Sequence, residues 1–297
     1  MKIFRVFKNA YKEWMKKDPF RESAVIAYYA IFSLPGLLVV VVTLAGYLFG
    51  RDVVNNHFIA QITATLGADT AEQIQTMIIK ASEIKNTVWA AVIGVITILV
   101  GATGVFAEFQ KSLNIIWEVK ASETKSGIWQ IIKIRLFSFG LILSIGFLLI
   151  VSLFISTLLT TFGDWLTSSI SESLLVLLVI LNIIVSIGIL SVLFALMLKV
   201  FPDAEIHWKD VWIGAIVTAI LFEIGKFALS LYFSKVNPGT SYGAAGSIVL
   251  ILLWVSYSSM IVFYGAEFTR AYTLETSGDR PPSEHAEKQP GRGKDVK

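Results

Sequence analysis

The chain has 297 residues, of which 55% are hydrophobic and only 16% are charged, with a mean hydropathy of +0.69 and a formal net charge of +3. A soluble domain usually carries about a quarter charged residues, so the composition argues against a soluble protein and favours one that sits in a membrane. The lack of cysteine excludes disulfides and thiolate metal sites, and the three scattered histidines predict no metal site.

The first twenty residues predict a basic amphipathic helix at the membrane interface. The aromatic residues that recur there at helical spacing are Phe4, Phe7, Tyr11 and Trp14. Lysine and arginine cover much of the remaining surface, which suits a helix resting on anionic phospholipid. An ordinary basic anchor in front of the first span is the alternative. Asp18 and Pro19 suit an N-cap and a first helical position, so the next helix is expected to begin there.

Six apolar blocks are long enough to cross a bilayer as helices, since the hydrocarbon core is about 30 Å thick and a helix rises about 1.5 Å per residue. They cover residues 24–49, 88–107, 136–162, 174–199, 211–233 and 246–270. With the N-terminus inside, the cytoplasmic segments hold 20 of the 25 Lys and Arg residues and the outer loops hold 4. This bias predicts a multi-pass protein with both termini in the cytoplasm.

No strand pattern competes with these blocks, so we predict an all-α integral membrane protein with six transmembrane helices in a membrane domain over 21–273. The longest outer loop, 50–87, has the apolar spacing of two short amphipathic helices. Residues 274–297 are rich in proline, glycine and charge, which predicts a disordered cytoplasmic tail.

Glu223 and Lys226 stand three residues apart within the otherwise apolar stretch ILFEIGKFAL of the fifth span. Counting along that span at about 1.5 Å per residue puts both near the middle of the bilayer, where charged side chains usually face the bundle interior or a wet cavity. They share a helical stripe with Ala215, Ala219 and Ser230, and small residues let another helix approach. The pair is either a polar site on a transport route or an ion pair that joins helices.

Further residues of the first and sixth spans are predicted to converge on the same polar site or to bend the helices around it: Tyr28, Tyr29, Ser33, Pro35, Gly243, Gly246 and Tyr257. Pro35 lacks an N–H and should kink the first span. The two glycines belong to a run of small residues before the sixth span, which is a candidate hinge that exposes backbone donors to an anionic ligand. A tight loop with close helix packing is the alternative.

Four polar residues at the inner ends of the second and sixth spans are predicted to lie near the cytoplasmic interface: Glu108, Gln110, Asn114 and Glu267. Gln110 and Asn114 continue a polar face beyond the second span, while Leu113, Ile116 and Trp117 continue an apolar one. This pattern describes a helix that leaves the membrane along the interface.

Five stretches resemble segments of the YihY/BrkB family, in the same order along the chain. They are SAVIAYYAIFSLPGLL (23–38), GATGVFAEFQKSLNIIWEV (101–119), RLFSFGLILSIGFLLIVSL (135–153), FPDAEIHWKDVWIGAIVTAILFEIGKFALSLYF (201–233) and SYGAAGSIVLILLWVSYSSMIVFYGAEFTRAY (241–272). The resemblance implies a bacterial multi-pass protein of the cytoplasmic (inner) membrane, with ties to virulence and to export of envelope lipid.

The family also carries an older label as a tRNA-processing ribonuclease, and the sequence argues against it. It has no Asp/His metal cluster and no basic, aromatic groove outside the membrane. We therefore expect no enzyme activity, no cofactor, no metal and no nucleic-acid partner.

The hypotheses that remain are not enzymatic. The first is a transporter or exporter of an envelope lipid or other amphiphile; without a Walker A motif, it would be driven by an ion gradient, a partner or the substrate's own gradient. The second is a small-solute or ion exporter that uses the same site. The third is a non-transporting scaffold for envelope machinery.

Overall fold

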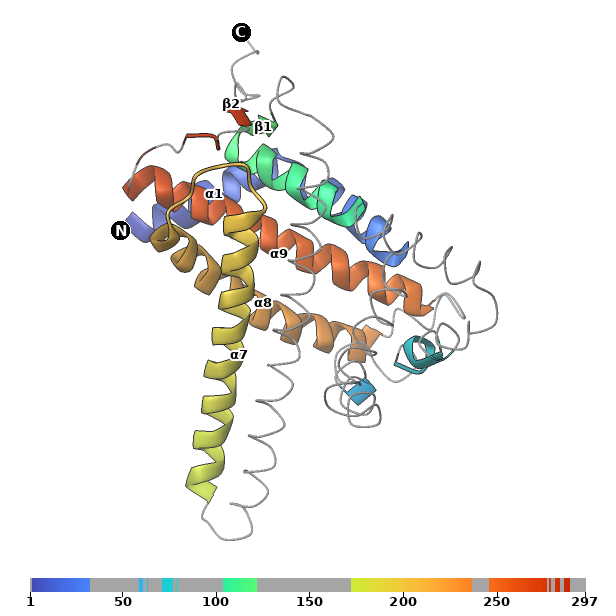
Figure 1. Ribbon diagram of the computed structural model, residues 1–297. Helices are drawn as coiled ribbons and strands as arrows, with labels where there is room; N and C mark the ends of the chain where they lie inside the picture. Colours follow the sequence, from blue (N-terminus) through green and yellow to red (C-terminus); the bar gives the residue numbers. More distant parts are fainter. Residues whose placement is uncertain are drawn as a thin grey trace.

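The structure is a computed structural model, and it describes residues 2–32, 59–60, 63, 71–76, 79, 104–121, 172–236, 246–276, 278, 281–283 and 286–288. These residues are mostly helical (Figure 1). The named elements are α1 (Lys2–Lys16), β1 (Val119–Ala121), α7 (Glu172–Val200), α8 (Trp208–Val236), α9 (Gly246–Thr276) and β2 (Ala286–Lys288). Further helical segments cover 19–32, 71–76 and 104–117.

Three helices, α7, α8 and α9, are long and apolar enough to cross a membrane. Their apolar stretches have mean hydropathies of 2.6, 1.7 and 2.0 and cover Ile183–Val200, Trp208–Phe233 and Ile248–Thr276. The apolar helices predicted at 174–199, 211–233 and 246–270 are therefore confirmed. The last of them continues past its predicted end, to Thr276.

The other predicted segments lie wholly or mostly outside the described residues: the spans 24–49, 88–107 and 136–162 and the outer loop 50–87. Within that loop, residues 71–76 are helical, where the sequence predicts an amphipathic helix. The number of six spans and the cytoplasmic position of both termini stay predictions.

Two glycine–threonine pairs form the crossing of α8 and α9. Gly214 of α8 faces Thr269 of α9, and Gly265 of α9 faces Thr218 of α8, so a Cβ at either glycine would clash with the threonine. Each hydroxyl is satisfied within its own helix, because Thr218 Oγ1 donates to Gly214 O and Thr269 Oγ1 donates to Gly265 O, both at 2.7 Å. The repeated Gly-x-x-x-Thr spacing thus lets two apolar helices approach closely without leaving a polar group unpaired.

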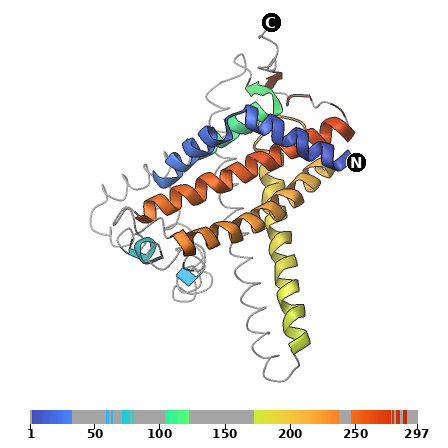
Figure 2. The ribbon, with the colours of Figure 1, turned by 180° about the vertical axis from the view of Figure 1, so that it is seen from behind.

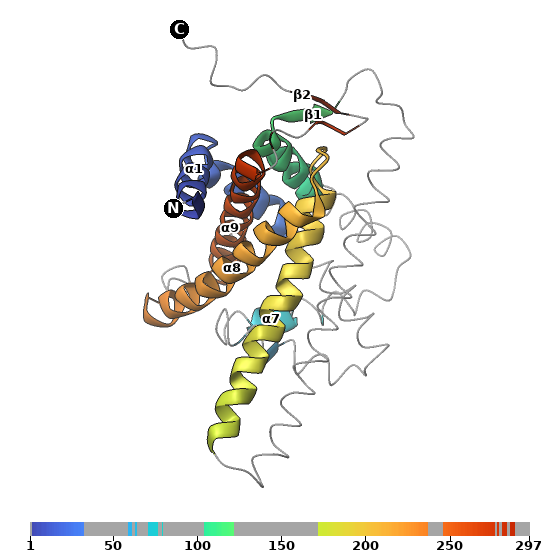
Figure 3. The ribbon, with the colours of Figure 1, turned by 90° about the vertical axis from the view of Figure 1, so that its left-hand side faces the viewer.

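Helix α7 packs on α8 near its C-terminal end and diverges from α8 and α9 toward its N-terminal end, as Figure 1 and Figure 3 show from two sides. At the packed end, Ala195 of α7 belongs to the same buried cluster as Ala219 of α8, and the rings of Phe194 and Phe222 meet edge to face at 5.5 Å. The core of the described residues therefore lies where α7, α8, α9 and the 104–117 helix meet.

Helix α1 lies against α9, with Val6 and Ala10 buried beside Phe268. The rings of Phe7 and Phe268 are 4.6 Å apart. Seen from behind in Figure 2, α1, the end of the 104–117 helix, the α7–α8 connection and the end of α9 gather at one end of the molecule. The polar residues that these segments carry can therefore meet.

A new helix begins at Pro19, as the sequence predicts. Asp18 O accepts backbone hydrogen bonds from Arg21 N and Glu22 N at 3.0 and 3.1 Å. Asp18 has a φ of 49°, a left-handed conformation that aspartate tolerates better than most residues do. This turn redirects the chain from α1 into the 19–32 helix.

A short sheet corrects two sequence-based expectations. β1 and β2 pair antiparallel, with Lys120 opposite Glu287, so the described chain is not purely helical. β2 lies within 274–297, which the composition predicts to be disordered, and Ser283 N also donates to Asp203 O at 3.0 Å. The prediction was wrong for these residues because backbone hydrogen bonds to a neighbouring segment need no apolar side chains.

Candidate functional site

The sequence-predicted pair on α8 meets in the structure and is linked to α7. Lys226 Nζ lies 2.6 Å from Glu223 Oε2. The other carboxylate oxygen, Glu223 Oε1, accepts a hydrogen bond from Ser186 Oγ at 2.9 Å. Sequence reasoning missed Ser186, because a single serine in an apolar helix gives no signal of which partner it will face.

The stripe that carries this pair runs from the core to an accessible surface. Ala215 and Ala219 are fully buried, whereas the side chains of Glu223 and Lys226 are 22% and 40% exposed. Phe227, beside Lys226 in sequence, lies on the outward face of the helix and is exposed. The ion pair therefore lies at the edge of the α7–α8 contact and is not sealed within it.

Helix α9 contributes Tyr257 to this neighbourhood. Its hydroxyl lies so close over Gly225 that a Cβ there would clash with it. Gly225 directly precedes Lys226, so the missing side chain lets a tyrosine from α9 approach the same turn of α8 that holds the pair. Ser186, Tyr257 and the ion pair thus come from three helices.

The structure puts Tyr28 and Tyr29 in a different setting from the pair. Tyr29 packs over Gly104, and the ring of Tyr28 meets that of Phe32 at 5.1 Å. Their contacts in the described part of the chain are therefore with the 104–117 helix and with their own helix. Gly246 is the first residue of α9 and is buried. Ser33, Pro35 and Gly243 lie outside the described residues.

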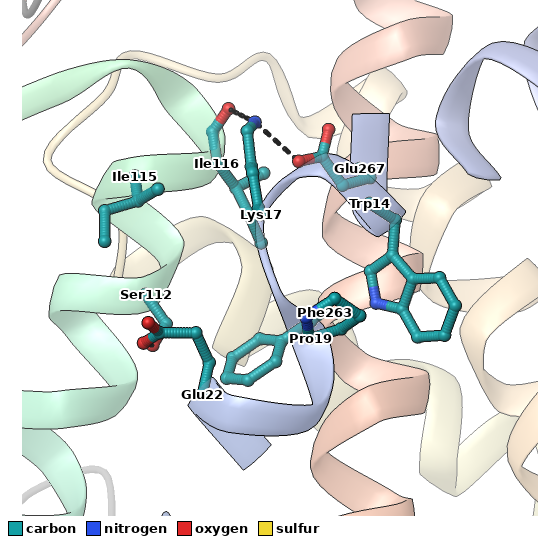
Figure 4. A pocket seen from close by; sticks show the side chains of 9 residues that line it. All are labelled: Trp14, Lys17, Pro19, Glu22, Ser112, Ile115, Ile116, Phe263 and Glu267. Carbon is teal, nitrogen blue, oxygen red and sulfur yellow. Dashed lines mark hydrogen bonds and ion pairs between the residues drawn. The ribbon is translucent and has the colours of Figure 1, made fainter. Parts of the chain in front are cut away.

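A second polar cluster forms where α1 turns into the 19–32 helix (Figure 4). Lys17 Nζ lies 2.5 Å from Glu267 Oε1 of α9 and donates to Ile116 O at 3.1 Å. A small pocket is lined there by Trp14, Lys17, Pro19, Glu22, Ser112, Ile115, Ile116, Phe263 and Glu267. One ammonium thus joins three separate segments of the chain.

Glu22 enters the same pocket from the opposite wall. Its Oε2 accepts a hydrogen bond from Ser112 Oγ at 3.0 Å, and its Oε1 lies 3.3 Å from Arg21 Nη2. Glu22 and Glu267 are both buried, and each carboxylate has a partner within the chain. This arrangement holds segments together and leaves neither acid as a free general base.

Gln110 and Asn114, predicted as interface residues, meet at Asp203 in the α7–α8 connection. Asn114 Nδ2 donates to Asp203 Oδ2 at 2.7 Å, and Asp203 N donates back to Asn114 Oδ1 at 2.8 Å. Gln110 Nε2 donates to the same carboxylate at 3.2 and 3.3 Å. The polar face beyond the second predicted span is therefore a docking face for another part of the chain.

Glu108, the remaining predicted interface residue, pairs with Lys111 one turn along its own helix at 2.8 Å. The hydrogen bond to Glu108 raises the pKa of Lys111 above its usual value. Sequence reasoning missed Lys17, Glu22 and Asp203. Lys17 sits in a run of similar cations, and nothing local marks which of them reaches a distant carboxylate.

The described residues do not form a metal-binding site. Among the residues that the structure describes, no group of three or more His, Asp or Glu side chains is arranged to hold a metal ion. The chemistry on offer at both polar clusters is charge pairing and hydrogen bonding.

The chain matches the model of a protein family, Virulence factor BrkB, over residues 10–290. A UPF0761 membrane protein of Saccharophagus degradans is 26% identical over 90% of this chain, which spans only 59% of that relative's length. A UPF0761 membrane protein of Alteromonas mediterranea is 27% identical over 88% of this chain and 84% of its own length. One of Vibrio cholerae is 26% identical over 74% of this chain and 68% of its own length. No solved structure matches the chain.

Proposed function

Because this chain belongs to the Virulence factor BrkB family and is a membrane protein, we propose that it transports or exports an envelope lipid or another amphiphile past the Glu223–Lys226 pair. We further propose that it does so in the bacterial cytoplasmic membrane, with six spans and both termini in the cytoplasm. The 20 to 4 distribution of Lys and Arg between the two sides supports that orientation.

The observation that carries the proposal is the accessibility of Lys226. A charged residue near the middle of a membrane helix costs about 2.5–3.5 kcal/mol on insertion scales. A purely structural ion pair would be expected to be covered by neighbouring helices, yet 40% of the Lys226 side chain is not covered by protein. An accessible cation held in an apolar span is what an anionic headgroup needs on its way across.

The geometry also weakens the view that the pair joins helices. Both charges belong to α8, so their ion pair spans one turn of a single helix. Within the described part of the chain, the pair is linked to another helix by the hydrogen bond from Ser186, and a neutral amide could accept that bond as well as a carboxylate. Joining α7 to α8 therefore does not require two opposite charges. A transport site does have a use for Glu223, because its carboxylate neutralises Lys226 when no substrate is bound.

Purified protein in liposomes should test the proposal directly. Labelled phospholipid in one leaflet should cross faster with the wild-type protein than in empty liposomes. Lys226→Met and Glu223→Gln should each slow this transfer. Lys235→Met is the matched control, because Lys235 is an exposed lysine at the end of the same helix and its loss leaves the pair intact.

The result that contradicts the proposal is equally specific. If Lys226→Met and Glu223→Gln fold normally and move the label at the wild-type rate, the pair has a structural role. If no lipid moves but a small fluorescent anion does, the site serves a solute exporter. If neither moves, the scaffold hypothesis is favoured.

A further inference from the structure

Helix α1 exposes an apolar line that its packing on α9 does not use. Val6 and Ala10 are the buried residues on the α9 side. Phe4, Tyr11 and Met15 are separated by seven and four residues, so they follow one line along the helix. They remain exposed, Phe4 by 74% and Tyr11 by 56%. One edge of the apolar face of α1 therefore contacts the protein and the other edge is uncovered.

A row of cations runs beside this uncovered line. Arg5, Lys8 and Lys12 are exposed and follow one another at spacings of three and four residues. They lie on the side of the line away from α9, so the order around the helix is protein contact, apolar line, basic row. An amphipathic helix in a membrane interface has this order, with its aromatic residues at the headgroup level and its cations near the phosphates.

The apolar line continues beyond the turn at Asp18. In the 19–32 helix the exposed residues Phe20, Ala24, Tyr28 and Phe32 recur every fourth position. The ring of Phe20 lies 6.4 Å from that of Trp14, a half-buried residue at the end of α1 that packs against the core. A surface this long, apolar on its face and basic on one rim, suits a lipid interface better than a compact protein partner.

We propose that α1 and the first turns of the 19–32 helix lie in the interface of an anionic leaflet. Phe4 and Tyr11 insert at the boundary between headgroups and acyl chains, and Arg5, Lys8 and Lys12 contact the phosphates of anionic phospholipids. The Lys17–Glu267 ion pair fixes the end of this surface to α9. This inference is independent of transport, because it concerns only where α1 lies and what it binds.

The lack of cysteine in the chain allows a direct test with single-cysteine variants of the full-length protein. Phe4→Cys places a spin label on the apolar line, and Asn9→Cys places one on the exposed polar side of the same helix. Each variant is reconstituted in nanodiscs of phosphatidylcholine alone or with added phosphatidylglycerol. The accessibility of the label to oxygen, which partitions into lipid, is compared with its accessibility to a water-soluble nickel complex.

With phosphatidylglycerol present, the label at position 4 should gain oxygen accessibility and lose nickel accessibility, while the label at position 9 stays accessible to nickel. The gain should shrink in the Lys8→Gln/Lys12→Gln background, and also when the salt is raised from about 0.1 M to about 1 M, which shortens the Debye length from about 10 Å to about 3 Å. A label at position 4 that stays accessible to nickel in both lipids overturns the proposal. So does a label shielded from both reagents, since that would mean a second protein or a second copy covers the line.

Discussion

Lys17 and Glu267 lie 250 residues apart in the chain and form an ion pair in which the carboxylate is only 2% exposed. Because Lys17 also donates to Ile116 O, this ammonium holds the start of the 19–32 helix, the end of the 104–117 helix and α9 together. This buried charge pair adds to the contacts that already join α1 to α9, such as the rings of Phe7 and Phe268 and the hydrogen bond from Tyr264 Oη to Phe7 O. Loss of this ion pair should therefore lower the stability of the whole fold.

Lys17→Met should destabilise the protein strongly, because it leaves the buried Glu267 carboxylate without its cation. Breaking a buried pair in this way typically costs about 3–5 kcal/mol. Thermal unfolding in detergent checks the prediction. Lys16→Met is the matched control, since the Lys16–Glu13 pair is exposed and such pairs contribute about 0–1 kcal/mol. Equal shifts in the two variants would mean that the Lys17–Glu267 pair is not a structural link.

The close crossing of α8 and α9 predicts that Gly265→Ala is destabilising. The new Cβ would clash with the side chain of Thr218, and overpacking of this kind typically costs about 1–3 kcal/mol. Gly188→Ala in α7 is the control, because nothing lies within 4 Å of a Cβ there and alanine favours a helix over glycine by about 1 kcal/mol. The melting temperatures of the two variants should move in opposite directions.

Removing the threonine methyl and hydroxyl gives the complementary experiment. Thr218→Gly in the Gly265→Ala background makes room for the new Cβ and should recover part of the lost stability, less the helix penalty of the added glycine. If the double variant is no more stable than the single one, the glycine–threonine contact does not set the spacing of α8 and α9.

Individual residues show which parts of the structure could be predicted from the sequence. The apolar blocks of α7, α8 and α9 are long and few charges interrupt them, so length alone predicts these helices. Asp18 and Pro19 act locally, and the helix start between them could be predicted as well. Lys17, Ser186 and Asp203 could not be assigned partners, because helical periodicity indicates which face a residue occupies and not what lies opposite. The strand β2 was missed for a related reason, since its pairing with β1 depends on a segment far away in the sequence.

Asp203 links the α7–α8 connection to the 104–117 helix, so Asp203→Ala should loosen that end of the molecule. Asn114 and Gln110 would lose their shared acceptor, and an unsatisfied partly buried donor costs about 1–3 kcal/mol. The tail should loosen too, although alanine retains the backbone O of Asp203 that accepts from Ser283 N, because the lost side-chain bonds no longer fix the position of that carbonyl. Faster amide exchange over 281–288 in Asp203→Ala than in the control Glu205→Ala, which changes an exposed neighbour, would support this. Unchanged exchange in both would show that the tail does not depend on the Asp203 side chain.

Ser230 and Leu231 can distinguish a wet polar stripe from a dry one without touching the ion pair. Ser230 lies seven residues after Glu223 and so shares its stripe, whereas Leu231 is on the outward face and is exposed. The two positions are at nearly equal depth, because neighbouring residues differ by only about 1.5 Å along the helix. The chain contains no cysteine, so each variant carries a single thiol. In intact liposomes, Ser230→Cys should react with a charged, water-soluble thiol reagent. Leu231→Cys should not react, because a cysteine that faces lipid stays largely as the unreactive thiol. Substrate lipid should slow the reaction at position 230 by occupying the stripe. A Ser230→Cys protein that remains as unreactive as Leu231→Cys would mean that the stripe is dry, and Glu223 and Lys226 would then be better understood as a structural pair.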